Sequence, residues 1–514
     1  MADPRLQLRS IPNNHKPRVF VTTDIGNEPD DSESLVRYLL YTNEFRTEGL
    51  VPCTSTHQRT VTRPDLITVA LRAYAQVVDT LNAHTHPENR YPTAEELSAL
   101  VKPGPAVYGR QALGPPGVPL AEGTKLLIEK VDASDTLTSP LWVLCWGGSN
   151  VLAQALQHIQ KTRPPQKLAD FVARLRVYLI SDQDDTAPWI RVNFPSLFLI
   201  GSVHGWCQYT TATWWGIACP EDGVNRSLFS REWLDANVKF AADGGGVNPL
   251  GRVYPYPAWQ IEGDTPSFLY LIPNGLGSPE HPGWGGWGGR YGAVDLSGYV
   301  NLYADSVDRV VGGDGKTYQS NSATVWRWAE AFQNDFAARM QWSVTGEFAG
   351  ANHAPVVVVN VNSNGHGHGH GRTEGALPLC LEVEAGETVT LDASESYDPD
   401  GDEISFSWFH YIEPTIAMGV WDLHIPKLDI VNVDDEVEGR KVQITMPPPG
   451  VCAVDQKTGE AQENGHVYHL VLEVKDSGSP CLRTYKRVVV QTTNRALVGG
   501  WPPVPHRAAS WEPE

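Results

Sequence analysis

The first half of the chain alternates between strand-like and helix-like runs, and this alternation limits the fold more than any other feature. RVFVTTD at Arg18–Asp24 is an apolar, β-branched run, and ESLVRYLLY after the next loop has helical spacing. EGLVPCTST at Glu48–Thr56 predicts a second strand, and Asp65–Leu81 predicts a long amphipathic helix. Because parallel strands need crossover connections, the pattern predicts an α/β fold with a mostly parallel sheet flanked by helices.

The second half shows strand alternation without a helical run. Thr388–Tyr411 and His466–Asp476 alternate apolar and polar residues between Asp, Gly and Pro turns, which predicts an all-β sandwich. A chain of 514 residues is also longer than one core usually organises. We expect an α/β domain over residues 16–345, a Gly/His-rich linker over 346–377, the sandwich over 378–496 and a tail over 497–514. The alternating histidines of the linker suit adventitious metal binding better than a built site.

Charge and composition limit the partners. The formal net charge is -20, from 60 acidic and 40 basic residues, and such a surface repels nucleic-acid backbones and anionic lipids. No apolar stretch approaches the length that spans a bilayer, and the first residues lack a signal-peptide core. We expect no nucleic-acid or membrane partner, and a cytoplasmic location unless a leader has been removed. Homo-oligomerisation stays open.

The segment TTDIGNEPDD at Thr22–Asp31 concentrates negative charge directly after the first predicted strand. Its four carboxylates fall within eight residues and belong to Asp24, Glu28, Asp30 and Asp31. Such hard oxygen ligands favour Ca²⁺ or Mg²⁺, and calcium accepts the more irregular ligand sets. The alternative is that some of these acids only cap a helix over Ser32–Tyr41. Calcium is the predicted cofactor.

The motif DIGNEPDD resembles the Asp-rich loop of nucleoside hydrolases. It is most similar to a nucleoside hydrolase-like family, often labelled cellulose-binding, that joins this domain to a C-terminal β-sandwich. The resemblance extends over almost the whole chain. It implies a calcium-dependent hydrolase that breaks an N- or O-glycosidic bond in a nucleoside or carbohydrate substrate.

The resemblance also implies a calcium ligand set drawn from distant segments. Ser149 comes from WGGSN at Trp146–Asn150, and an ordinary helix N-cap is a compatible alternative for it. Asp264 comes from EGDTPSFLYLI at Glu262–Ile272. The implied ligands are Asp24, Asp31, Ser149 and Asp264. Asp24 would in addition take the proton of a metal-held water that attacks with inversion.

The leaving-group chemistry departs from the family pattern. Many nucleoside hydrolases carry a His immediately before the last Asp ligand, whereas this chain has Gly263. Glu262 and His281 are the nearest residues of a type able to act as a general acid. We therefore expect one of them to protonate the leaving group.

Polar and aromatic residues near the predicted strand ends form the expected substrate site. Flat aromatic rings stack on sugars and bases, but they also fill cores, so packing is the alternative for each tryptophan. The assigned residues are Asn27, Asp30, His57, Asn150, Trp189, Asn193, Trp284, Trp287 and Arg290. The runner-up function is a non-catalytic carbohydrate-binding protein with a structural calcium ion.

The sandwich sequence LDASESYDPDGDEISFSWF is similar to cadherin-like and polycystic-kidney-disease repeats. Asp398, Asp400 and Asp402 in its DPDGD turn offer ligands for a structural calcium ion. Asp and Gly are also what a tight turn requires without a metal. The metal-free turn is the simpler interpretation.

Overall fold

The computed structural model describes residues 3–497 except 115–118, 134–137, 204–206, 219–220, 242–247, 258–260, 364–370, 417–424 and 456–457. The chain divides into two compact units. Unit 1 comprises Met1–Leu6, Ser10–Ile272 and Gly286–Ala351, and unit 2 comprises Gln7–Arg9, Pro273–Gly285 and Asn352–Glu514. None of the described helices has the length and apolar character of a bilayer-spanning segment. The expected tail over 497–514 lies outside the described residues except for its first residue.

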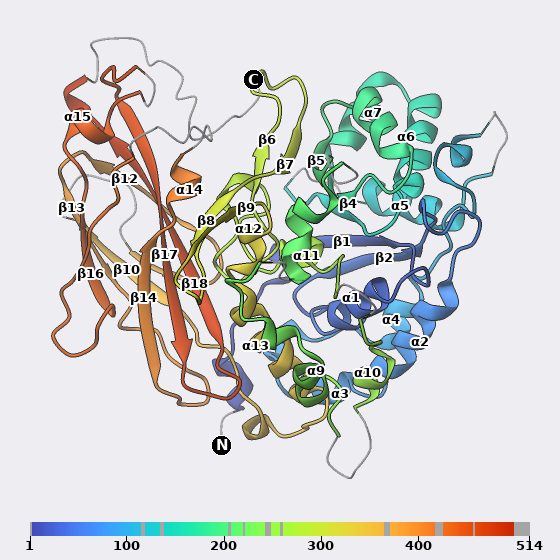
Figure 1. Ribbon diagram of the computed structural model, residues 1–514, viewed down its shortest axis with the longest axis horizontal. Helices are drawn as coiled ribbons and strands as arrows, with labels where there is room; N and C mark the ends of the chain where they lie inside the picture. The colour runs from blue at the N-terminus through green and yellow to red at the C-terminus, as the bar shows by residue number, and fades with distance from the viewer. Residues whose placement is uncertain are drawn as a thin grey trace. The chain divides into compact units, whose positions relative to one another are not determined.

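Unit 1 is built on a mostly parallel sheet, as the sequence predicts (Figure 1). The strand order is β2-β1-β3-β4-β5-β7-β6, and only the edge strand β6 runs antiparallel to its neighbour. The strands are β1 Arg18–Thr23, β2 Arg46–Pro52, β3 Leu141–Cys145, β4 Leu175–Ser181, β5 Phe198–Ser202, β6 Tyr291–Ala293 and β7 Leu302–Asp305, with a separate hairpin of β8 Asp308–Val311 and β9 Thr317–Ser320.

Helices flank this sheet because its central strands are apolar on both faces. Every residue of β1 and β3 is buried. Phe20, Val143 and Val177 pack into a core with side chains of α5, α6, α7 and α8. The helices are α1 Asp30–Leu39, α2 Pro64–Tyr74, α3 Val78–Asn82, α4 Ala94–Ser98, α5 Glu122–Asp132, α6 Asn150–Thr162, α7 Pro165–Ala173, α8 Thr186–Asn193, α9 Arg231–Asn237, α10 Pro249–Val253, α11 Pro266–Leu269, α12 Ala323–Trp326 and α13 Ala329–Trp342.

The single helix predicted over Asp65–Leu81 is wrong, because the segment forms two helices, α2 and α3. The backbone N–H of Ala75 bonds to both Leu71 and Ala73, which tightens the last turn of α2. After this break Val77 and Leu81 are 2% and 0% exposed. The break thus directs these two apolar side chains into the interior. In one straight helix they would point in a different direction.

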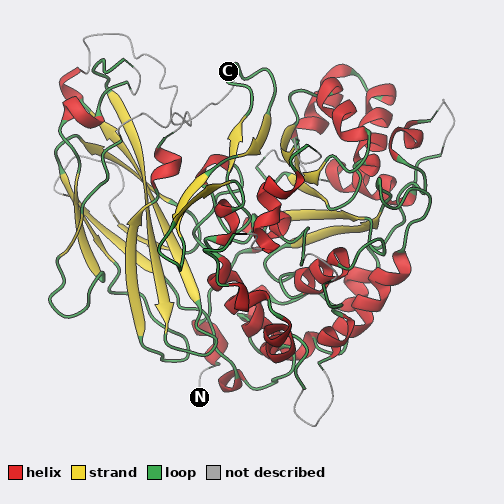
Figure 2. Cartoon of the chain, viewed as in Figure 1, coloured by secondary structure: helices red, strands yellow, loops and turns green. Residues whose placement is uncertain are grey.

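Unit 2 contains two β-sheets that share one hydrophobic core (Figure 2). Their strand orders are β11-β10-β13-β16-β15 and β12-β18-β17-β14, and all neighbours are antiparallel except β12 and β18. The strands are β10 Val358–Ser363, β11 Gly371–Glu374, β12 Leu379–Glu384, β13 Thr388–Asp392, β14 Ile404–His410, β15 Ile430–Asn432, β16 Lys441–Thr445, β17 Asn464–Asp476 and β18 Arg483–Thr493. Two short helices, α14 Ile412–Thr415 and α15 Pro449–Cys452, interrupt them.

The predicted linker over 346–377 is partly wrong. Its residues Val358–Ser363 form β10, which pairs with β11 on one side and with β13 on the other. Val359 is fully buried, so this β-branched run belongs to the core of the sandwich. The histidines at 366, 368 and 370 lie outside the described residues.

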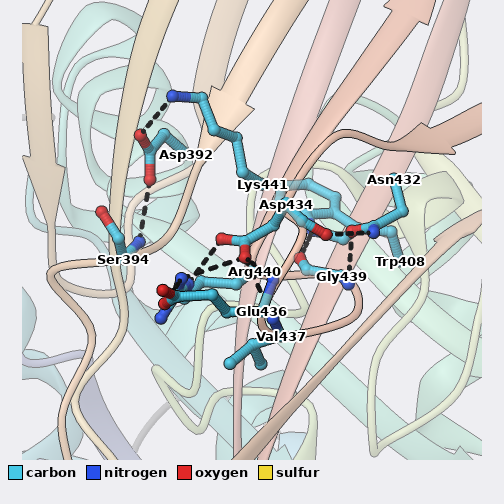
Figure 3. Close-up of polar contacts among 10 residues, drawn as sticks. All are labelled: Asp392, Ser394, Trp408, Asn432, Asp434, Glu436, Val437, Gly439, Arg440 and Lys441. Carbon is cyan, nitrogen blue, oxygen red and sulfur yellow. Dashed lines mark hydrogen bonds and ion pairs between the residues drawn. The ribbon is translucent and has the colours of Figure 1, made fainter.

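A polar cluster fixes the turn between β15 and β16 (Figure 3). The guanidinium of Arg440 donates to the Asp434 carboxylate, whose oxygen also accepts the N–H of Val437 at 3.0 Å. Gly439 has φ +77°, a conformation that glycine adopts without strain, and its carbonyl accepts the indole N–H of Trp408 at 2.9 Å. The turn therefore couples the two sheets of the sandwich.

The segment Pro273–Gly285 belongs to unit 2 although unit 1 precedes and follows it in the chain. Backbone N–H of Tyr485 on β18 donates to the carbonyl of Asn274 at 3.0 Å. The buried Arg487 guanidinium donates to the carbonyls of Leu276 at 2.6 Å and Trp284 at 3.0 Å. These bonds attach the segment to the edge of β18.

His410 at the end of β14 makes the stability of unit 2 depend on pH. Its Nδ1 accepts the N–H of Leu428 at 3.4 Å, and burial lowers its pKa to about 4. An unfolded His titrates near 6.5, so the unfolded chain binds the proton first. The neutral His410 ring therefore contributes roughly 2–3 kcal/mol to the free energy of unfolding of unit 2, and this contribution is lost as pH drops from about 6.5 toward 4.

Urea denaturation of the full chain at pH 7.0 and 4.5 measures this effect. The variant His410→Gln should lose less stability than the wild type between the two pH values. An equal loss in both proteins would contradict the assignment to His410.

Candidate functional site

A polar pocket opens at the carboxyl ends of the strands of unit 1. Ligand sites in open α/β sheets lie at this edge. The lining residues come from β4, from the first turn of α1, from the segments that follow β1, β2, β3, β4 and β5, and from the turn before α11: Asp24, Asn27, Glu28, Asp30, Asp31, His57, Trp146, Ile180, Gln183, Tyr209, Trp214, Gly263 and Asp264.

The loop after β1 is shaped so that its carboxylates face this pocket. Gly26 has φ +102°, and an added Cβ would lie 2.8 Å from Leu66, so only glycine fits the turn. The side-chain amide of Gln58 donates to the carbonyl of Asp24 at 3.2 Å. Pro29 rather than an acid holds the N-cap position of α1 and makes no side-chain cap bond. Helix capping therefore does not explain the acids.

Three carboxylates converge in the pocket and are here called the acidic triad: Asp30, Asp31 and Asp264. Oxygen atoms of all three lie within 4.8 Å of one another, and the residues are 8%, 4% and 2% exposed. The buried Oδ2 of Asp264 has no hydrogen-bond partner among the described residues. Burial, reinforced by the neighbouring carboxylates, raises the pKa of Asp31 and of Asp264 well above the usual range.

Such an arrangement of buried acids is costly unless a cation or protons neutralise it. A set of carboxylate oxygens around one centre is what Ca²⁺ or Mg²⁺ prefers. The unpaired oxygen of Asp264 offers a further ligand position. The donor set therefore fits a divalent cation.

Asp24 lies beside the acidic triad in the same pocket. The pKa of its carboxyl is raised to about 7, mainly because the group is buried, while a hydrogen bond from Ser55 opposes the shift and the nearby Asp30 adds to it. A carboxylate with a pKa near neutrality is suited to accept a proton in a reaction.

Two glycines after β3 allow close approach: Gly147 makes room for Asp24, and Gly148 for Asp184 and the Thr54 carbonyl. The N–H of Trp146 bonds to the carbonyl of Thr22 at 2.8 Å and that of Gly148 to Thr54 at 3.0 Å, which brings the loop against β1 and β2. A Cβ on Gly147 would lie 2.5 Å from Asp24 Oδ1. Gly147 in the sequence WGGSN is thus required because Asp24 lies so close to it.

The two residues that follow these glycines are not among those that line the pocket, and their assignments as a metal ligand and a substrate contact stay predictions. Ser149 holds the N-cap position of α6, and its carbonyl accepts the N–H of Ala153 at 2.9 Å. Asn150 is fully buried and donates to the Thr54 hydroxyl at 2.9 Å and the Val107 carbonyl at 3.0 Å. Both residues brace neighbouring loops instead.

Neither predicted general acid lies in the pocket lining. The Glu262 carboxylate pairs with Arg37 at 2.7 Å and accepts the Tyr254 hydroxyl at 2.8 Å. His281 belongs to unit 2, where its ring stacks on Trp284 at a centroid distance of 4.1 Å. Both general-acid assignments, and that of Trp284, stay predictions, and none of the three residues is among those that line the pocket.

Packing roles account for the remaining aromatic and polar assignments. Arg290 forms a buried ion pair with Asp308 at 2.6 Å, and Trp287 is 3% exposed. Trp189 packs against the core and Phe194, while Asn193 donates to the Trp189 carbonyl at 2.8 Å. None of these four predicted residues lines the described pocket.

Six predicted residues do come together in the pocket. They are Asp24, Asn27, Asp30, Asp31, His57 and Asp264. His57 is exposed, and partial desolvation lowers the pKa of its imidazole, which favours the neutral ring. The acids, an amide and a neutral imidazole provide both acceptors and a donor for sugar hydroxyls.

Three aromatic residues of the pocket, Trp146, Tyr209 and Trp214, were not predicted as site residues. Tyr209 and Trp214 lie in the 3-10 helices Tyr209–Thr211 and Thr213–Ala218 after β5, with ring centroids 5.0 Å apart. Burial and the carboxylates of the pocket raise the pKa of Tyr209, so its phenol stays protonated. The aromatic run at Tyr209–Trp215, placed after a strand of the same sheet, was the available signal.

Comparison with known proteins places the chain in a family. The model described as "Cellulose-binding Sde182, nucleoside hydrolase-like domain" matches residues 18–291, more than half of the chain. The chain belongs to this family. The Sde182 C-terminal domain model, "Cellulose-binding protein Sde0182, C-terminal domain", matches residues 388–492. The cadherin-like identity of this part stays a prediction.

A solved structure extends the relation to the Sde182 family over nearly the full length. It is described as a nucleoside hydrolase-related hypothetical protein from Saccharophagus degradans that is associated with carbohydrate metabolism. The two share 31% sequence identity, with a TM-score of 0.70, over 93% of this chain and 100% of the other. No curated protein matches the chain.

Proposed function

We propose that the protein is a calcium-dependent hydrolase of an N- or O-glycosidic bond in a nucleoside or carbohydrate. The observation that carries this proposal is the acidic triad, in which three buried carboxylates converge and Asp264 Oδ2 lacks a partner among the described residues. Asp31 and Asp264 would hold the cation together with Asp24 and Asp30. A hydrolase-like family and a site at the strand ends are consistent with this chemistry.

The side chains of the pocket would then have different roles in bond cleavage. A glycosidic bond breaks through an oxocarbenium-like state, which nearby carboxylates stabilise. Calcium, when bound, supplies positive charge that orients water and sugar hydroxyls. Asp24 accepts the proton of the attacking water at its carboxylate, and water attack on one face gives inversion.

The remaining lining residues would bind the substrate and its leaving group. Asn27 and His57 face the same pocket as the carboxylates and would hydrogen-bond sugar hydroxyls. Tyr209 supplies a protonated O–H, and the Trp214 ring supplies a flat wall. The phenol of Tyr209 is therefore the group of the lining best suited to donate a hydrogen bond to a leaving group.

The second candidate function is carbohydrate binding without turnover. The description of the family as cellulose-binding supports it. In that case the cation would bridge the carboxylates to sugar hydroxyls and no bond would break. The two candidates share the site and differ only in chemistry.

Turnover with and without calcium tests the proposal. Nucleosides, aryl furanosides and aryl pyranosides are incubated with protein saturated with calcium, and with protein stripped by EGTA. We expect activity that EGTA abolishes and added calcium restores. EGTA-insensitive activity would refute the metal mechanism, and an inactive wild type that binds cello-oligosaccharides would support the second candidate.

A further inference from the structure

Helix α1 carries more than the two acids at its start. Glu33, Ser34 and Arg37 follow Asp30 by three, four and seven residues, so they lie along one face of the helix. All three are completely buried. The face that begins with the acidic triad therefore continues as a buried polar row.

This row contacts the turn that presents Asp264. Arg37 donates to the Glu262 carboxylate at 2.7 Å, and Glu33 accepts the backbone N–H of Glu262 at 2.8 Å. The hydroxyls of Ser34 and Thr265 lie 3.1 Å apart. One helix thus holds the residues on either side of Asp264 while its own first turn supplies Asp30 and Asp31.

Glu262 is held in an unfavourable backbone conformation. Its φ of +46° is the only positive value of a non-glycine residue among the described residues. Such a conformation costs about 1–3 kcal/mol and persists only where the surroundings impose it. Arg37 and Tyr254 donate hydrogen bonds to its carboxylate, and its backbone N–H donates to Glu33. These hydrogen bonds impose the conformation.

Arg37 is in turn fixed from the side of α13. It donates to the side-chain carbonyl of Gln333 at 2.9 Å and to the Phe332 carbonyl at 2.6 Å. Its guanidinium lies 4.5 Å from the centroid of the Phe336 ring. The arginine therefore cannot follow Glu262 if that residue moves.

We propose that Glu262 and Arg37 are positioning residues that set the spacing between Asp264 and the two aspartates of α1, and thereby the affinity for calcium. The inference rests on the proposed calcium site. Neither residue lines the pocket, so both act through Asp264. Partners that orient metal ligands typically account for about 10–100-fold in metal affinity.

The variant Glu262→Gln tests this spacing, because it keeps the size of the side chain and removes its charge. Glu44→Gln is the matched control, since Glu44 forms an equally buried ion pair with Arg339 at 2.8 Å in the same unit. Calcium titration calorimetry should give a dissociation constant raised about 10–100-fold in Glu262→Gln and unchanged in Glu44→Gln. Arg37→Lys, which keeps the charge, should lie between the wild type and Glu262→Gln.

Hydrogen exchange on the metal-free proteins separates this inference from the calcium proposal. Residues 262–268 and 30–34 should lose protection in Glu262→Gln and keep it in Glu44→Gln. If the wild type binds no calcium but this local loss occurs, the calcium site fails and the positioning role stands. Unchanged protection, or equal loss in Glu44→Gln, would overturn the positioning role, and Arg37→Lys decides the outcome if Glu262→Gln does not fold.

Discussion

Replacement of Asp24 by alanine is expected to lower kcat by about 10²–10⁴-fold, the usual contribution of a positioned general base. Asp24 lines the pocket of the acidic triad, and the pKa of its carboxyl, raised to about 7 by burial, suits proton transfer near neutral pH. Steady-state kinetics on the best substrate of the glycoside screen measures the effect. The fold should survive, since the change removes a buried charge.

Binding distinguishes the two candidate functions in the same variant. Loss of turnover with retained binding of cello-oligosaccharides supports an enzyme. Asp65→Ala serves as the control, because Asp65 is an exposed carboxylate of unit 1 that pairs with the exposed Arg63. Wild-type turnover in Asp24→Ala would rule out the proposed base.

Gly147→Ala should damage the site as severely without removing any functional group. The new methyl group would lie 2.5 Å from Asp24 Oδ1 and 2.8 Å from its Cβ, so the aspartate or the loop must move. A shift of about 1 Å at a reacting group is enough to cost about 10²-fold in rate. We expect a loss of kcat/KM of this order, measured with the same substrate.

Gly292→Ala is the matched control for this change. A Cβ at Gly292 meets no atom within 4 Å, and the residue lies on the edge strand β6. Its kinetics should equal those of the wild type. If Gly147→Ala were also unaffected, the loop after β3 would not govern the position of Asp24.

The main features of the fold could be predicted because they depend on local patterns of apolar and polar residues. The β-branched run that became β1 is buried throughout, and the alternation of strands and helices predicted a parallel sheet. The strand β10 was missed, since its Asn-rich end resembles a loop. Pairing with β13 across about thirty residues stabilises it, and such pairing leaves no local pattern.

The site was predictable where its residues follow strands of one sheet. Asp24 and Asp31 follow β1 at the edge where the carboxyl ends of the parallel strands lie, whereas Asp264 reaches the same pocket from the turn before α11. The ion pairs of Glu262 with Arg37 and of Arg290 with Asp308 could not be foreseen, because these partners are known only once the chain is folded. The position of a charged residue near a motif does not show whether its side chain forms an ion pair in the folded protein.

The placement of Pro273–Gly285 in unit 2 has a consequence for how this architecture can be inherited. Because the chain enters unit 2 at Pro273 and returns to unit 1 at Gly286, no single cut separates two complete units. A gene fragment ending near Ala351 would leave the carbonyls of Leu276 and Trp284 without their donor Arg487. The segments of unit 2 therefore alternate with those of unit 1 along the gene. The two units are thus constrained to be inherited together.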